Sequence, residues 1–138
     1  MKFLLDTNIC IYIIRNRPPE VFDRFRRLAP GTAGISVITY FELKYGALRS
    51  EEPKKNSAMI EQFTLPLEIV PMEIAMADEC AALRIELKHS PIGPMDLLIA
   101  GQARNLGATL VTNNTREFSR VKGLKVENWV LREVKAEK

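Results

Sequence analysis

The chain has 138 residues, of which 46% are hydrophobic and 27% are charged, and its formal net charge is +3. This length suits one compact domain with its own core, and the ordinary share of charged residues excludes a mainly disordered chain. We therefore expect a single domain over residues 1–138, with a core at about 2–129 and a polar tail at 130–138. No apolar run approaches the roughly 18 residues that a membrane-spanning helix needs, so we expect a cytoplasmic protein with no membrane association.

The predicted elements alternate between strands and helices along the chain. Short apolar runs predict strands at 3–6, 31–35, 67–70, 108–112 and 124–129. Apolar residues at helical spacing predict helices at 9–15, 20–28, 36–50, 55–64, 74–88 and 95–106. Ser36 is expected to cap the third helix, and Gly107 to end the last one. This alternation indicates an α/β fold in which a central, mainly parallel sheet of about four to five strands is flanked by helices.

Acidic and amide side chains lie beside apolar segments at separate points of the sequence. Asp6 ends the first predicted strand, and Asn114 follows the fourth. Glu42 and Asp96 lie within predicted helices. Because parallel strands end at one edge of the sheet, where such folds bind ligands, we expect these side chains to face one pocket. Converging carboxylates repel one another, and a divalent cation with oxygen ligands relieves that repulsion.

Each of these residues also has a purely structural explanation. Asp6 or Asn8 can cap a helix, and Asp96 can stabilise a helix dipole. Glu42 and Glu117 can be solvent-facing charges, and the amide after the fourth strand can belong to a turn. Their joint occurrence in an α/β chain favours metal-dependent phosphoryl transfer.

Several other chemistries lack their residues. The sequence contains no glycine-rich phosphate loop and no G-x-S-x-G elbow. His89 is the only histidine, which excludes a ribonuclease with two histidines as acid and base. Cys10 and Cys80 lack metal-finger spacing and are expected to be reduced core residues.

The positive net charge must lie away from the acidic residues, and a basic rim around an acidic cleft suits a nucleic acid. A solvated basic surface explains the same charge. The densest basic stretch contains Arg15, Arg17, Arg24, Arg26 and Arg27. Further candidates for such a rim are Lys54, Lys55, Lys88 and Arg116.

Separated motifs carry a resemblance to a known family: Leu5-Asp-Thr-Asn8, the helix with Glu42, and the segments 91–101 and 111–118. With them the chain resembles the PIN-domain ribonucleases and, more narrowly, the VapC toxins of bacterial toxin–antitoxin pairs. The resemblance runs from residue 2 to residue 129. The ending at 120–129 is also similar to the VapC branch that cuts initiator tRNA in its anticodon stem-loop.

The resemblance implies a set of catalytic residues. The family's acidic ligands for Mg²⁺ or Mn²⁺ fall on Asp6, Glu42 and Asp96. Its fourth acid falls on Asn114, which brings an oxygen but no charge, so Glu117 is a candidate to supply the missing charge. Supporting roles fall on Thr7 and Thr112, which would orient ligands or water, and on Asn8, which would fix the loop around Asp6.

The resemblance also implies an activity and partners. The expected activity is site-specific cleavage of RNA, with tRNA as the substrate, by metal-activated attack of water, which inhibits translation. The expected partners are a VapB-type antitoxin across the acidic pocket, which would insert a basic side chain, and a second copy of the chain, with a higher assembly when the antitoxin binds. Residues 9–14 or 40–48 would supply the homodimer interface. The alternatives are a catalytically silent PIN domain that binds RNA or protein, and a metal-dependent DNA nuclease.

Overall fold

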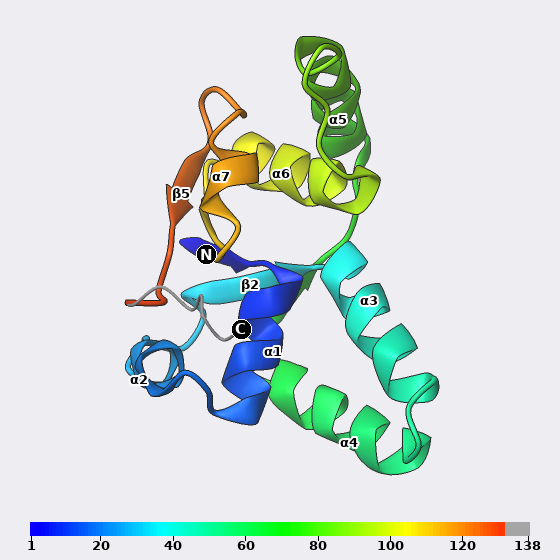
Figure 1. Ribbon diagram of the computed structural model, residues 1–138, viewed down its shortest axis with the longest axis vertical. Helices are drawn as coiled ribbons and strands as arrows, with labels where there is room; N and C mark the ends of the chain where they lie inside the picture. Colours follow the sequence, from blue (N-terminus) through cyan, green and yellow to red (C-terminus); the bar gives the residue numbers. More distant parts are fainter. Residues whose placement is uncertain (132–138) are drawn as a thin grey trace.

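The computed structural model describes residues 1–131 and has the predicted alternation of strands and helices (Figure 1). The strands are β1 (Phe3–Leu5), β2 (Ala33–Ser36), β3 (Glu68–Val70), β4 (Thr109–Val111) and β5 (Lys125–Glu127). The helices are α1 (Thr7–Arg15), α2 (Pro19–Arg26), α3 (Val37–Leu48), α4 (Pro53–Thr64), α5 (Ile74–Glu86), α6 (Pro94–Leu106) and α7 (Thr115–Phe118). The predicted α/β fold is therefore confirmed.

The five strands form one parallel sheet in the order β3-β2-β1-β4-β5. Side chains of β1 alternate between its faces, as in any strand. Phe3 and Leu5 join one buried cluster, whereas Leu4 joins the other. Figure 1 shows α1, α2 and α4 on one side of the sheet and α5, α6 and α7 on the other. Both faces are therefore covered, which explains why the strands are short apolar runs.

Several element boundaries differ from prediction. Three helices begin at a proline, one or two residues before their predicted starts: Pro19, Pro53 and Pro94. Proline fits the first helical turn because its missing N–H would have no partner there. Two predicted boundaries are confirmed: Ser36 Oγ accepts a bond from the Ile38 N–H at 2.9 Å, and Gly107 ends α6 with φ 69°.

The C-terminal part of the described chain closes one face of the core. Trp129 is buried and packs edge-on against Phe3, with ring centroids 5.5 Å apart. Val130 is also buried in this cluster, so the core continues one residue past the predicted 129. The rest of the predicted polar tail, residues 132–138, lies outside the described residues. Among the helices described within residues 1–131, none is long and apolar enough to cross a membrane.

Helix α6 packs closely against α5, and a glycine permits the approach. A Cβ built on Gly101 would lie 2.3 Å from Cys80 Sγ and 3.1 Å from Cys80 Cα. A Cβ built on Gly46, in the last turn of α3, meets nothing within 4 Å. Both glycines lie in helices, but a side chain at Gly101 would collide with Cys80, whereas a side chain at Gly46 would have free space.

We predict that Gly101→Ala destabilises the fold and that Gly46→Ala does not. Overpacking at Gly101 should lower the free energy of unfolding by about 1–3 kcal/mol. Gly46→Ala should raise it by up to about 1 kcal/mol, because alanine favours a helix more than glycine does. Urea unfolding of both variants beside the wild type checks this pair, and equal stability of the two variants would contradict it.

Candidate active site

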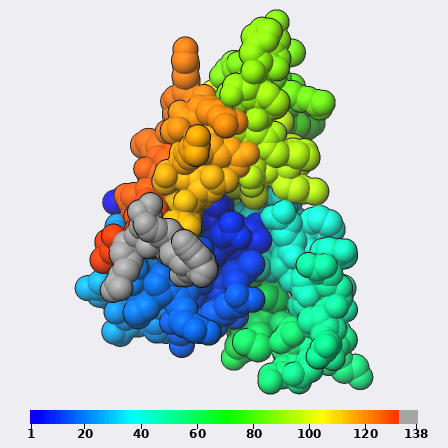
Figure 2. Space-filling model, viewed as in Figure 1, coloured from blue at the N-terminus to red at the C-terminus, as the bar shows by residue number. Residues whose placement is uncertain are grey.

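The ends of β1, β2 and β4 meet at one edge of the sheet. Strand β1 is at the centre of the sheet. Strands β2 and β3 follow on one side of it, and strands β4 and β5 follow on the other. The order therefore reverses between β1 and β4, which is where open α/β sheets form a ligand crevice. In the space-filling view the start of α1 is visible between α7, α6 and α3 (Figure 2).

Asp6 follows β1 directly and is 5% exposed. It caps α1: its Oδ1 accepts a bond from the Ile9 N–H at 3.0 Å, and its Oδ2 accepts one from the Thr112 hydroxyl. Thr112 follows β4, and its Oγ accepts in turn from the Asn114 N–H at 2.9 Å. Burial raises the pKa of Asp6, although the hydrogen bonds that Asp6 accepts from Thr112 and Ile9 oppose the rise. The residue is therefore both a helix cap and a buried acid in the crevice.

Glu42 reaches the same crevice from α3. The hydroxyl of Thr7, the first residue of α1, donates to Glu42 Oε1 at 2.5 Å, and it also lies 3.3 Å from the hydroxyl of Thr39. The Glu42 charge is close enough to raise the pKa of Asp6. Thr7 and Thr112 thus each donate a hydrogen bond to one of the two carboxylates, that of Glu42 and that of Asp6.

Asp96 lies in the first turn of α6. Its pKa is raised to about 7, first by burial, then by a hydrogen bond with Glu117 and the charges of Glu117, Asp6 and Glu42. Glu117 lies on α7, where its Oε2 accepts from the Gly93 N–H at 3.1 Å and its Oε1 from the Asn114 amide at 2.7 Å. Glu117 is therefore fixed beside Asp96 and belongs to the acidic group.

The structure thus brings together Asp6, Glu42, Asp96 and Glu117. Asn114 is exposed at the start of α7, where its amide donates to Glu117, and Asn8 is exposed in the first turn of α1. Within residues 1–131, no three acidic, histidine or cysteine side chains are close enough to enclose an ion as they stand.

Sequence reasoning missed α7 and gave Glu117 only a subsidiary place. The alternative of a purely solvent-facing charge does not hold, because Glu117 is partly buried and both its carboxylate oxygens accept hydrogen bonds. A signal was present: Asn114 and Glu117 have the spacing of a capping box, a cap residue followed three positions later by glutamate. The contact with Gly93 has no such local signature.

The two cysteines and the only histidine of the sequence have no part in the acidic group. Cys10 and Cys80 are free and buried, which confirms them as reduced core residues. His89 is exposed in the turn that follows α5.

Comparison with known proteins identifies the family. The sequence model of the PIN domain matches residues 3–124. The chain belongs to the PIN-domain family. Within it, the chain is 47% identical over 131 residues to the tRNA(fMet)-specific endonuclease VapC of Shigella flexneri, covering 94% of this chain and 98% of the relative. Ribonuclease VapC2 of Haemophilus influenzae is 45% identical over 132 residues, covering 94% and 99%.

A solved structure agrees as well. The DNA-bound VapBC complex of Salmonella typhimurium contains a chain with a TM-score of 0.89 and 42% identity, covering 94% of this chain and 99% of that one. These matches confirm the resemblance to VapC proteins that the separated motifs carry. They place the acidic group of this PIN domain in a fold shared with named ribonucleases.

We predict that Asp96 makes the metal-free PIN domain less stable as pH rises. Its pKa is about 7 in the fold and 3.8 without the fold, so the folded state holds a proton that the unfolded chain releases. This stabilising contribution is complete below about pH 4 and is lost as pH rises through about 7. In EDTA, wild type should lose stability relative to Asp96→Asn between about pH 5 and pH 8. Chemical unfolding across this range measures the difference, and a constant difference would refute the prediction.

Proposed function

We propose that this PIN domain is a metal-dependent, site-specific endoribonuclease and the toxin of a toxin–antitoxin pair, acting in the cytoplasm. The observation that carries the proposal is the convergence of Asp6, Glu42, Asp96 and Glu117 at the strand-order reversal. The names of the relatives support RNA as the substrate, and the tRNA(fMet)-specific enzyme of Shigella flexneri supports initiator tRNA. Within that tRNA we propose the anticodon stem-loop as the place of cleavage.

The chemistry of the side chains suits a divalent cation. The donors are carboxylate oxygens, which Mg²⁺ and Mn²⁺ prefer. Burial and mutual repulsion raise the pKa of both Asp6 and Asp96, so a cation would stabilise their charged forms. Asp6, Asp96 and Glu42, the last directly or through water, would hold it. When bound, the ion would polarise the phosphate and lower the pKa of an attacking water.

The protein's own groups prepare the site for that chemistry. The Thr112 hydroxyl and the Ile9 N–H each occupy one lone pair of the Asp6 carboxylate and leave a second on each oxygen. Thr7 holds Glu42 in the same way. Glu117 lies beside Asp96, and its hydrogen bond and charge help to raise the pKa of Asp96, so Asp96 would lose its proton when a cation binds. In-line attack by water would leave a 5′-phosphate and a 3′-hydroxyl.

The proposal includes protein partners. A VapB-type antitoxin is supported by the VapBC complexes among the similar structures, and a basic side chain inserted among the carboxylates would compete with metal. For a homodimer, the structure favours one of the two predicted segments. Residues 9–14 lie in or against the core, whereas Phe41, Tyr45 and Leu48 on α3 are 53%, 57% and 62% exposed. We therefore propose the α3 face as the contact between copies and as part of the higher assembly with antitoxin.

Purified protein should make a discrete cut in initiator tRNA in Mg²⁺ or Mn²⁺. EDTA, Asp96→Asn and Asp6→Ala should each abolish the cut, because each removes the ion or one of its ligands. Mapping the RNA ends by primer extension, beside circular dichroism of both variants, gives the site and confirms folding. A cut retained in either folded variant would refute the assignment. Equal cleavage of single-stranded DNA would indicate a DNA nuclease, and metal binding with no cleavage a silent binding module.

We predict different roles for Asn114, the cap of α7, and for Glu117 of α7, which accepts a hydrogen bond from it. Asn114→Ala should lower kcat/KM by about 10- to 100-fold, because it removes a donor to Glu117 and leaves the acids in place. Glu117→Gln should lower it more, since it removes a charge from the acidic group, and should weaken Mn²⁺ binding in titration calorimetry. A larger loss for Asn114→Ala than for Glu117→Gln would show that the amide itself is the more important group.

A further inference from the structure

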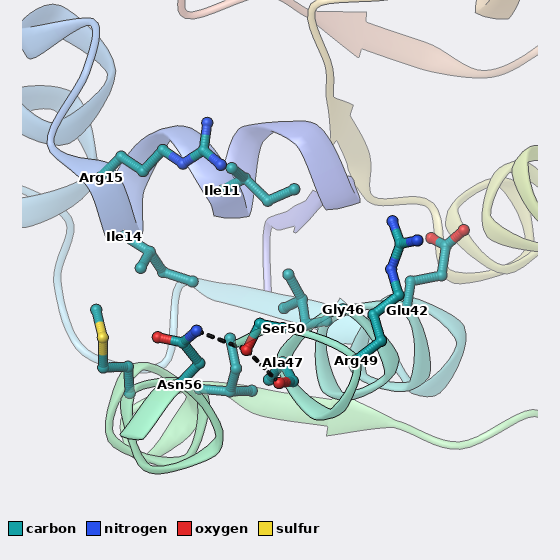
Figure 3. A pocket seen from close by; sticks show the side chains of 12 residues that line it. Ile11, Ile14, Arg15, Glu42, Gly46, Ala47, Arg49, Ser50 and Asn56 are labelled. Atoms are coloured by element: carbon teal, nitrogen blue, oxygen red, sulfur yellow. Dashed lines mark hydrogen bonds between the residues drawn. The ribbon is translucent and has the colours of Figure 1, made fainter. Parts of the chain in front are cut away.

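A pocket with a volume of about 510 Å³ opens between α1, α3 and α4, and Glu42 is one of its lining residues (Figure 3). This volume lies within the range of about 300–1,000 Å³ that is typical of ligand sites. Glu42 belongs both to the pocket wall and to the acidic group, whereas none of the other three acids lines the pocket. An occupant would therefore lie next to the reacting group without displacing it.

The pocket has an apolar wall and a basic rim. Its apolar side chains are Ile11, Ile14, Leu43, Ala47, Met59 and Ile60. Arg15, in the last turn of α1, and Arg49, at the end of α3, supply the rim. Figure 3 shows their guanidinium groups toward opposite ends of the pocket, with that of Arg49 on the side of the Glu42 carboxylate.

Arg15 belongs to the basic stretch predicted from sequence, and Arg49 does not; both differ from Arg24 and Arg26 of that stretch. Arg24 pairs with Glu127 at 3.1 Å, and Arg26 pairs with Asp23 at 3.1 Å. Over residues 1–131, the ion pairs involve neither Arg15 nor Arg49. Arg49 instead lies 5.4 Å from the centroid of the Tyr45 ring. The rim thus offers two positive charges that make no ion pair within residues 1–131.

A polar pair completes the wall on the side of α4. The Asn56 amide nitrogen donates to Ser50 Oγ at 2.8 Å, and the Ser50 hydroxyl donates to the Ala47 carbonyl at 2.6 Å (Figure 3). The bond to Ser50 uses the nitrogen of the Asn56 amide and leaves the amide's carbonyl oxygen as an acceptor. An amide held in this way can accept from the edge of a nucleobase.

We propose that this pocket binds an unstacked base of the RNA substrate beside the cleaved phosphate, with Arg15 and Arg49 on the phosphates that flank the base. The proposal rests on the ribonuclease function proposed above. Proteins recognise RNA through splayed bases that stack on side chains and offer their edges to hydrogen bonds. The apolar wall, the Asn56 amide and the two guanidinium groups supply a surface for each part of such a nucleotide. The charge of the rim favours a polyanion over an apolar peptide segment.

The first test separates the two arginines from the rest of the basic surface. In an Asp96→Asn background, which binds without cutting, the Arg15→Ala/Arg49→Ala double variant should bind a synthetic initiator tRNA anticodon stem-loop about 10-fold or more weakly. The slope of log Kd against log salt should fall by about 1–2, one phosphate contact for each arginine. Arg84→Ala, an exposed arginine on α5, is the matched control and should bind as the parent does. Fluorescence anisotropy at several salt concentrations gives both quantities.

The second test fills the pocket without removing a charge. Gly46 lines it, and a Cβ there meets nothing within 4 Å, so Gly46→Leu can occupy the space while α3 stays intact. In the active enzyme, this variant and the double arginine variant should raise KM for the stem-loop by about 10-fold and change kcat less. Mn²⁺ affinity should remain that of wild type, because the acidic group is unchanged.

The outcomes separate the pocket from the catalytic proposal. Wild-type affinity and KM in both the double variant and Gly46→Leu would overturn the RNA pocket while leaving the ribonuclease function intact. The same result with loss of affinity for an antitoxin peptide would assign the pocket to that partner instead. A wild-type protein that cuts no RNA would refute the proposed function, and the binding measurements would still decide whether the pocket contacts RNA.

Discussion

The site depends on the burial of one carboxylate, that of Asp6, at the end of β1. A charged group that is 5% exposed requires donors, and here they are the Ile9 N–H and the Thr112 hydroxyl. The first donor exists only because α1 begins immediately after the strand. The second exists because β4 pairs with β1 in a register that opposes Leu5 and Val111. The register between β1 and β4 therefore fixes the position of the Asp6 carboxylate, and the other acids lie around that carboxylate.

Asp96 reaches the site on a helix, so its position depends on how that helix packs. The close approach of Gly101 to Cys80 fixes α6 against α5, and the Gly93–Glu117 bond fixes the start of α6 against α7. The second contact also brings Glu117 next to Asp96, which raises the pKa of Asp96 to about 7 with burial as the larger cause. The same contact thus positions the helix and adjusts the charge of its acid.

The distribution of charge explains how a chain of net charge +3 can contain an acidic centre. Some arginines stabilise the fold: Arg104 bonds to both Glu79 and Glu86 of α5, and Arg24 bonds to Glu127 beside Trp129. Arg15 and Arg49 border a pocket that Glu42 also lines. The density of basic residues in the sequence is consequently a poor guide to an RNA surface, because neighbouring arginines in α1 and α2 have different partners.

The sequence by itself determined the α/β class, the strands, the helices other than α7 to within two residues at each end, and the family, since these rest on local periodicity, prolines, caps and short motifs. It also singled out Asp6, Glu42 and Asp96, because a carboxylate beside an apolar run is conspicuous without any structure. Only the tertiary structure decided the place of Glu117, whose partner Gly93 is 24 positions away. It alone showed that Arg49 and Arg15 border one pocket, and that α3 rather than α1 exposes an apolar face. The physical reason is the same in each case: these properties belong to contacts between elements, and local sequence preferences do not encode which elements meet.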